Sequence, residues 1–385
     1  MSTTYLIKIQ PANHFFFGMD VNLGSGLYGN SKTYFIKSLL FPQQTSLLGL
    51  VRHTILLQTG AIMHGVKSIP YAKRAEATIN IGPNGFGGIS TAYGKIEKIS
   101  PVFISTMQGN EHYFLRSAEF TSPINKDEMQ SIIRSDCRDY KIQLGDNVTR
   151  EEGRITNYSY KDPFMQILIN EKGNWLFLKN EFKADEKPEA FRMHVSNRIW
   201  PNIQYALTEA ERVGIRKGEN GKTEEEAYYK QVFLRFANDY CFGCYVTLAE
   251  DILVEKSMLT TFGKEKSTVK LIITKNNMPD WNRHIFNADV SSNKILLLSD
   301  CVVPDSYLDV VDFGITNLNR FGYLRTTVQD ENYGGHQFLQ RAPTQQTVLS
   351  RGSVMYLKDL KRWERLADQP LYQNIGMNQY VAISN

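Results

Sequence analysis

Short runs of hydrophobic residues separated by polar, glycine-containing segments dominate the chain and predict many strands and few helices. Residues 5–9 read as a strand that Pro11 ends. Similar runs predict strands at 101–105, 175–178, 294–298 and 379–383. The segment Ala-Leu-Thr-Glu-Ala at 206–210 instead favours a helix.

One segment has clear helical periodicity. Its apolar stripe consists of Leu47, Leu48, Val51 and Ile55. The stripe predicts a helix at about 46–58, which Thr45 or Ser46 can cap. Gly60 stands where a left-handed residue commonly ends a helix. Arg52 lies about 100° from the centre of the stripe, so its guanidinium is expected to reach solvent.

The pattern of elements indicates the α+β class. Few helices and mostly antiparallel strands, with long loop insertions, are typical of that class. The 385 residues exceed one ordinary hydrophobic core and suit two domains. The chain becomes polar and charged at 121–162, so we expect the domains to comprise residues 1–150 and 151–385.

Net charge, cysteine content and the length of apolar runs limit which classes of protein the chain can belong to. A formal net charge of +4 is mild, so any nucleic-acid site must be local or shared with partners. The four scattered Cys residues favour a reducing compartment. No apolar run approaches the roughly 20 residues of a membrane span, and the N-terminus lacks a signal-peptide pattern. We therefore expect a cytoplasmic protein without membrane association.

Three segments resemble cofactor or metal motifs only in part. Residues 24–29 fit G-x-G-x-x-G, but no strand precedes them directly and no helix follows, so a surface loop is favoured. Residues 218–223 lack the first Gly of a phosphate-binding loop, because position 216 is Arg. Cys241 and Cys244 form a single C-x-x-C, and we expect them to be buried beside a strand. The sequence thus predicts neither a cofactor nor a metal site.

Basic residues gather in two places that suit RNA. A loop at 212–223, expected to be mobile, carries Arg212, Arg216, Lys217 and Lys222. Their charge suits phosphates, although a solvated charge run explains them equally well. Further on, Arg341 leads towards Arg351-Gly352-Ser353 at the start of a strand. A Gly beside an Arg at that point lets a backbone approach a bound chain, but a β-bulge would look the same.

Four stretches, in this order, resemble the RAMP superfamily of CRISPR systems, RNA-binding proteins of ferredoxin-like fold. Within it they resemble the tag-capping subunits of type III-B (Cmr) effector complexes. The stretches are the N-terminal strand, the segment 42–52 with its Gly and Arg, the segment 213–229 with its polar loop, and residues 351–356.

The resemblance implies two ferredoxin-like (RRM-like) domains, no catalytic activity and a role in antiviral defence. The protein would grip the 5′ tag of the guide RNA (crRNA) in a ribonucleoprotein. It would also dock the large polymerase/cyclase-like subunit and the first backbone RAMP subunit. Gly49 and Arg52 match the family's helix motif, and Gly352 and Ser353 match its C-terminal motif. The expected RNA contacts are Gly49, Arg52, His53, Arg212, Arg216, Lys217, Lys222, Arg341, Arg351, Gly352 and Ser353.

Two alternatives stay open. The first is a RAMP-type endoribonuclease that processes guide-RNA precursors, with His336 as the best candidate for general acid–base chemistry. Metal-independent RNA cleavage that is lost in His336→Ala would identify it. The second is a purely structural subunit, which an absence of RNA cross-links would favour.

Overall fold

The computed structural model describes residues 2–18, 34–63, 69–83, 86, 92–109, 111–115, 150–151, 154–155, 167–169, 175–177, 206–217, 223–237, 239–263, 266–278, 293–328, 337–342 and 346–382. Its helical elements are α1 (Gln44–Gln58), η1 (Tyr71–Lys73), α2 (Arg74–Ile81), η2 (Asp305–Asp309), α6 (Leu360–Ala367) and α7 (Pro370–Gln373). Its strands are β1 (Thr3–Pro11), β2 (Tyr34–Lys37), β3 (Ile96–Ile99), β4 (Phe103–Thr106), β5 (Phe114–Leu115), β6 (Arg150–Glu151), β7 (Arg154–Ile155), β8 (Ile167–Ile169), β9 (Trp175–Phe177), β10 (Leu207–Lys217), β11 (Thr223–Phe236), β12 (Tyr240–Leu248), β13 (Lys256–Phe262), β14 (Ser267–Lys275), β15 (Lys294–Leu297), β16 (Val311–Ile315), β17 (Leu318–Phe321), β18 (Leu324–Val328), β19 (Gln337–Arg341), β20 (Gln346–Leu349), β21 (Val354–Leu357) and β22 (Tyr380–Ala382). Mixed α and β structure with antiparallel sheets and few helices is confirmed.

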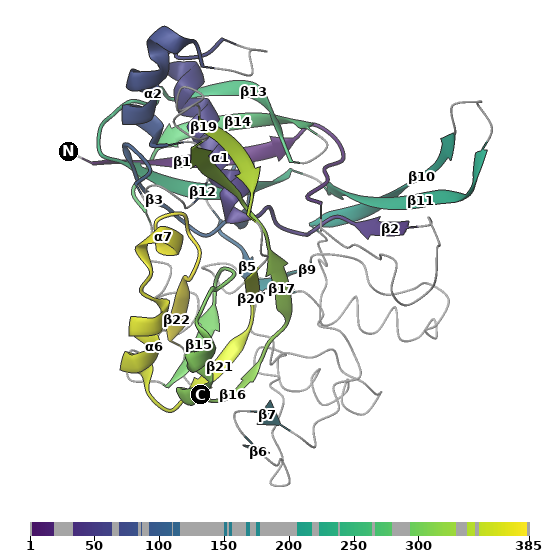
Figure 1. Ribbon diagram of the computed structural model, residues 1–385, viewed down its shortest axis with the longest axis vertical. Coiled ribbons are helices and arrows are strands. Elements are labelled where there is room, and N and C mark those ends of the chain that lie inside the picture. The colour runs from purple at the N-terminus through teal and green to yellow at the C-terminus, as the bar shows by residue number, and fades with distance from the viewer. Residues whose placement is uncertain are drawn as a thin grey trace.

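The largest sheet has the order β13-β14-β1-β12-β3, and β4 also pairs with β12 (Figure 1). Strands β1 and β3 are both antiparallel to β12, which lies between them. The connection from β1 to β3 contains α1, so these elements form a split βαβ unit. The sheet combines strands from both sides of residue 150, where we expected a domain boundary.

Helix α1 forms where the sequence predicts it. Leu47, Leu48, Val51 and Ile55 are all buried in the core that also contains Tyr5, Ile7 and Ile9 of β1. Gly60 has φ +69°, which confirms the left-handed residue after the helix. The expected cap is wrong: the N-cap residue is Gln43, without a side-chain hydrogen bond.

Residues 206–217 differ from expectation. The segment expected to begin as a helix and continue as a mobile loop is instead strand β10, paired antiparallel with β11 with a register shift between Ile215 and Lys217. Cross-strand pairing has overridden the helix propensity of Ala, Leu and Glu, because tertiary context outweighs propensity. The β10–β11 hairpin extends away from the rest of the described chain, and β2 pairs in parallel with β11 along it (Figure 1).

A second main sheet has the order β16-β21-β15-β22 and carries α6, whose Trp363 is fully buried. The two main sheets meet in one hydrophobic cluster. Leu6, Phe103 and Tyr245 come from the first sheet, and Leu296 and Val354 from the second. The remaining sheets contain only two or three short strands: β17-β20, β18-β19, β5-β8-β9 and β6-β7.

The structure also bears on the C-x-x-C segment and on the expected absence of a membrane span. Cys241 and Cys244 are buried within β12, as the structural interpretation of the C-x-x-C predicts. Within the described ranges, none of the helices has the length and hydropathy to span a membrane.

Candidate nucleic-acid interface

The β10–β11 hairpin has two faces of different charge. On one face, Lys37 of β2 pairs with Glu209 of β10 at 3.0 Å. On the same face, Lys230 of β11 pairs with Glu211 at 2.6 Å. Both lysines of this face therefore already have a carboxylate partner, which leaves little net charge for an anionic ligand.

Among the described side chains of the hairpin, the opposite face carries two arginines and no acidic group. Because side chains alternate along a strand, Thr208 and Arg212 of β10 share this face with their cross-strand partners Arg235 and Gln231 of β11. Arg212 and Arg235 are both exposed. No carboxylate of a described residue pairs with either guanidinium. Exposed guanidinium groups are suited to binding a phosphate.

The N-terminal segment extends this surface at the base of the hairpin. Phe15 forms an antiparallel bridge with Leu234, with hydrogen bonds of 2.7 and 3.0 Å in the two directions. This register sets exposed His14 opposite Arg235 and places Phe16 against Phe233, with ring centroids 5.2 Å apart. We call the surface formed by His14, Thr208, Arg212, Gln231 and Arg235 the cationic face.

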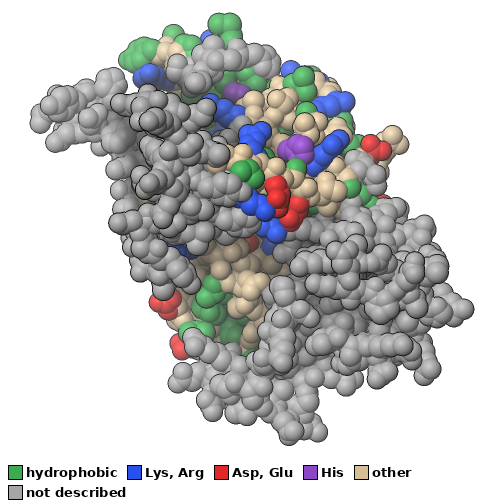
Figure 2. Space-filling view, turned by 90° about the vertical axis from the view of Figure 1, so that its right-hand side faces the viewer, with side chains coloured by type: hydrophobic (Ala, Val, Ile, Leu, Met, Phe, Trp, Pro, Cys, Tyr) green, Lys and Arg blue, Asp and Glu red, His purple; other side chains and the backbone are tan. Residues whose placement is uncertain are grey.

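The hairpin projects from one side of the described chain (Figure 1). Figure 2 looks onto that side and shows Lys and Arg side chains gathered there, with acidic groups among them. Within β10, alternation places Glu209 and Glu211 on one face and Arg212 on the other. Charge separation across a thin hairpin gives an anion one side to bind.

Arg52 lies elsewhere, and its expected exposure is wrong. Its side chain is buried, with Nε donating a hydrogen bond of 2.9 Å to the Ile81 carbonyl oxygen. Its Cζ lies 5.5 Å from the centroid of the Tyr93 ring. Burial lowers the pKa of Arg52 to about 10, although the neighbouring Tyr93 opposes that shift. The residue ties α1 to the end of α2.

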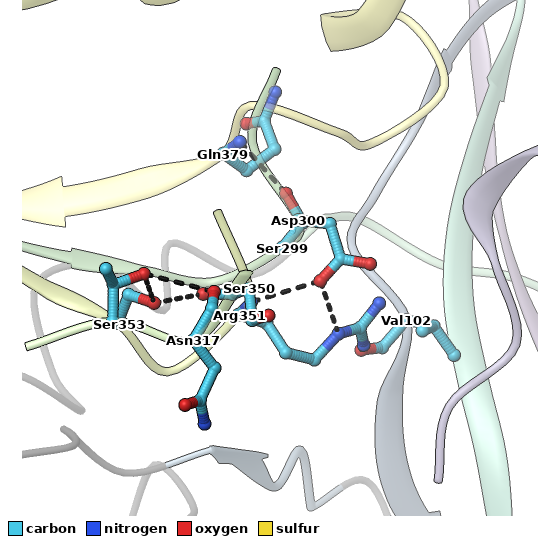
Figure 3. A network of polar contacts seen from close by, with 9 residues as sticks. Val102, Ser299, Asp300, Asn317, Ser350, Arg351, Ser353 and Gln379 are labelled. Carbon is cyan, nitrogen blue, oxygen red and sulfur yellow. Dashed lines mark hydrogen bonds and ion pairs between the residues drawn. The ribbon is translucent and has the colours of Figure 1, made fainter. Parts of the chain in front are cut away.

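The C-terminal motif forms a buried turn (Figure 3). Arg351 donates from its backbone N–H to Asp300 Oδ1 at 3.1 Å, and its Nε lies 3.8 Å from the same oxygen. Gly352 has φ +82°, a conformation that favours glycine. Ser353 donates from Oγ to the Ser350 carbonyl oxygen at 2.6 Å. These contacts close the turn between β20 and β21.

The other residues expected at an RNA site are scattered. Gly49 is exposed on α1, and His53 is half-buried on the same helix. Arg216 and Lys217 belong to β10, and Arg341 ends β19. Lys222, His336 and the glycine-rich segment 24–29 lie outside the described residues. Of the expected contacts, Arg212 is the one whose described side chain lies on the cationic face.

Sequence reasoning missed Arg235 and the position of His14. The signal for Arg235 was present, because Val232-Phe233-Leu234-Arg235-Phe236 places one cation inside an apolar run. In a half-buried strand, such a cation marks the solvent face. In the described part of the chain, no three His, Cys, Asp or Glu residues are grouped as metal ligands.

Comparison with known proteins gives the following similarities. A family model described as CRISPR-associated protein (Cas_Cmr3) matches residues 7–384. A cryo-EM structure described as the type III-B Cmr-beta bound to cognate target RNA contains a similar chain at 15% identity, with a TM-score of 0.45 and 98% and 96% of the two chains covered. A chain in a crystal structure of a Csm3-Csm4 subcomplex of the type III-A interference complex is similar at 10% identity, with a TM-score of 0.36 and coverages of 91% and 92%. No curated protein matches the sequence.

Proposed function

The chain belongs to the CRISPR-associated Cas_Cmr3 family, and we propose that it is the non-catalytic subunit that holds the 5′ tag of the guide RNA in a type III-B effector complex. In this proposal it has two ferredoxin-like domains and works in the cytoplasm in antiviral defence. It also docks the large polymerase/cyclase-like subunit and the first backbone subunit.

The cationic face is the single observation that carries the proposal. Arg212 and Arg235 are exposed on one side of a projecting hairpin, while Glu209 and Glu211 of β10 lie on the other side. Single-stranded RNA is bound by positively charged surfaces that follow its backbone. The mild net charge of +4 fits a local site of this kind rather than a uniformly basic surface.

Docking of partner subunits is supported by exposed apolar side chains near the ends of α1 and α2. Met63, Tyr71 and Ile79 are 74%, 86% and 64% exposed. Tyrosine, methionine and arginine are enriched at protein interfaces, and Arg74 lies 5.5 Å from the Tyr71 ring centroid. A surface of this composition suits a protein partner better than it suits RNA phosphates.

Co-expression of the chain with its complex partners, followed by ultraviolet cross-linking, tests the proposal. We expect guide RNA of a defined 5′ end, cross-linked to peptides of β10 and β11. RNA that shortens on incubation with the chain alone would contradict a non-catalytic role. Cross-links confined to other subunits would contradict tag binding by this chain.

A further inference from the structure

We propose that Arg212 is a stacking platform for one unpaired nucleobase, in addition to contacting phosphate. This inference rests on the proposed function, because it names the part of the RNA that this position recognises. The ligand is a base of single-stranded RNA, bound by its planar face and therefore without strict base identity.

Three planar side chains lie next to one another near the base of the hairpin: Phe16 contacts Phe233, and Phe233 contacts Arg212. The Phe16 and Phe233 ring centroids are 5.2 Å apart, with the rings tilted by 46°. Cζ of Arg212 lies 4.8 Å from the Phe233 centroid on β11. Phe16 and Phe233 are 1% and 7% exposed, whereas Arg212 is exposed. The series thus begins in the core and ends at a guanidinium in solvent.

The backbone fixes this arrangement from both sides. The bridge between Phe15 and Leu234 sets Phe16 beside Phe233. Pairing of Arg212 with Gln231, two residues from Phe233, sets the guanidinium over the ring as a diagonal neighbour on one face. Because these contacts exist in the free protein, little side-chain freedom is lost when a ligand binds.

The guanidinium of Arg212 lies over the Phe233 ring, and the arginine side chain is exposed. Unpaired bases stack on guanidinium planes as well as on aromatic rings. Exposed Arg235 and His14 lie on the same face and supply contacts for the adjoining phosphates. The cationic face therefore offers a base position flanked by backbone positions, which is the pattern that single-stranded nucleic acid requires.

The experiment compares two probes with the full chain: a short oligoadenylate and an abasic ribose-phosphate chain of the same length. Arg212→Lys keeps the charge but removes the planar group. We expect the wild-type protein to prefer the oligoadenylate, and Arg212→Lys to lower that preference by about tenfold. Arg235→Lys is the matched control on the same face and should retain the preference.

The outcomes separate this inference from the proposed function. If Arg212→Lys prefers the oligoadenylate as strongly as the wild-type protein does, the stacking role is overturned while RNA binding stands. If neither probe binds the wild-type protein, both the stacking role and the proposed function are overturned. The melting temperature of Arg212→Lys should equal that of the wild-type protein, because the side chain is exposed.

Discussion

The guanidinium of Arg351 lies over the ring of Phe41, with Cζ 4.4 Å from the ring centroid. Its Nη1 also donates a hydrogen bond of 3.4 Å to the Val102 carbonyl oxygen. Phe41 and Val102 belong to the core of the first main sheet, whereas Arg351 lies three residues before the start of β21 in the second. One buried arginine thus connects the two sheets, so we assign the residue to stability.

Replacing Arg351 should therefore destabilise the protein. Arg351→Ala removes a desolvated cation–π contact and the side-chain ion pair with Asp300, so we expect a loss of about 2 kcal/mol in the free energy of unfolding. Arg362→Ala is the control, because its pair with Asp309 is half exposed and exposed pairs contribute about 0–1 kcal/mol. Urea unfolding measures both. If Arg351→Ala leaves the free energy of unfolding unchanged but weakens RNA binding, Arg351 contributes to the RNA interface and not to stability.

Arg52 and Arg74 allow the same contact to be tested in two environments. Each has its Cζ 5.5 Å from a Tyr ring centroid, but Tyr93 is 3% exposed and Tyr71 is 86% exposed. Because desolvation strengthens the interaction, Arg52→Ala should lower the free energy of unfolding by about 2 kcal/mol, and Arg74→Ala by well under about 1 kcal/mol. Equal losses in thermal unfolding would contradict the burial of Arg52.

Two glycines should respond in opposite ways to alanine. A Cβ on Gly376, which has φ +83°, would lie 2.2 Å from Gln44 Nε2 and 2.4 Å from the Ser100 carbonyl oxygen. Gly376→Ala should therefore destabilise the protein by more than about 1 kcal/mol. Gly49 is exposed in α1 with no atom within 4 Å of such a Cβ, so Gly49→Ala should stabilise it by about 0.5–1 kcal/mol. A melting curve for each variant distinguishes these signs, and a stabilising Gly376→Ala would exclude the tight approach.

Stability should fall at alkaline pH, in part through Cys244. Burial raises the pKa of this thiol to about 12 from an ordinary value of 9.0. Above pH 9 the unfolded chain binds fewer protons than the folded chain, so the free energy of unfolding decreases as pH rises towards 12. Cys244→Ala should lessen this decrease by about 1 kcal/mol between about pH 8 and pH 10. The free energy of unfolding is measured by urea unfolding at several pH values for the wild-type protein and Cys244→Ala. If it falls equally with pH in both, the thiol ionises as easily in the folded state as in the unfolded state.

Local patterns predicted the elements that depend on local sequence. The spacing of Leu47, Leu48, Val51 and Ile55 predicted α1, and β1 followed from a short apolar run ended by Pro11. The β10–β11 hairpin was missed because the sequence of β10 by itself favours a helix. What stabilises β10 as a strand is its pairing with β11, which comes later in the chain.

The positions of the arginines depended on long-range contacts. Arg351 packs on Phe41, a residue far away in sequence, and no periodicity near Arg351 signals that burial. Arg52 was expected in solvent because the helical wheel describes α1 alone, while α2 and Tyr93 cover that side of the helix. The charge of Arg212 identified it as a candidate. Which face of the hairpin it lies on could be assigned only from the register between β10 and β11.

The most direct test of RNA binding by the cationic face is the affinity of the full chain for single-stranded RNA, measured over a range of salt concentrations. Arg212→Ala combined with Arg235→Ala should weaken binding at least about tenfold and lower the salt slope by about 0.7 for each phosphate that the variant no longer neutralises. Lys37→Ala combined with Lys230→Ala removes the same charge from the opposite face, where both lysines pair with glutamates, and should change affinity little. Equal weakening in the two double variants would contradict RNA binding by the cationic face.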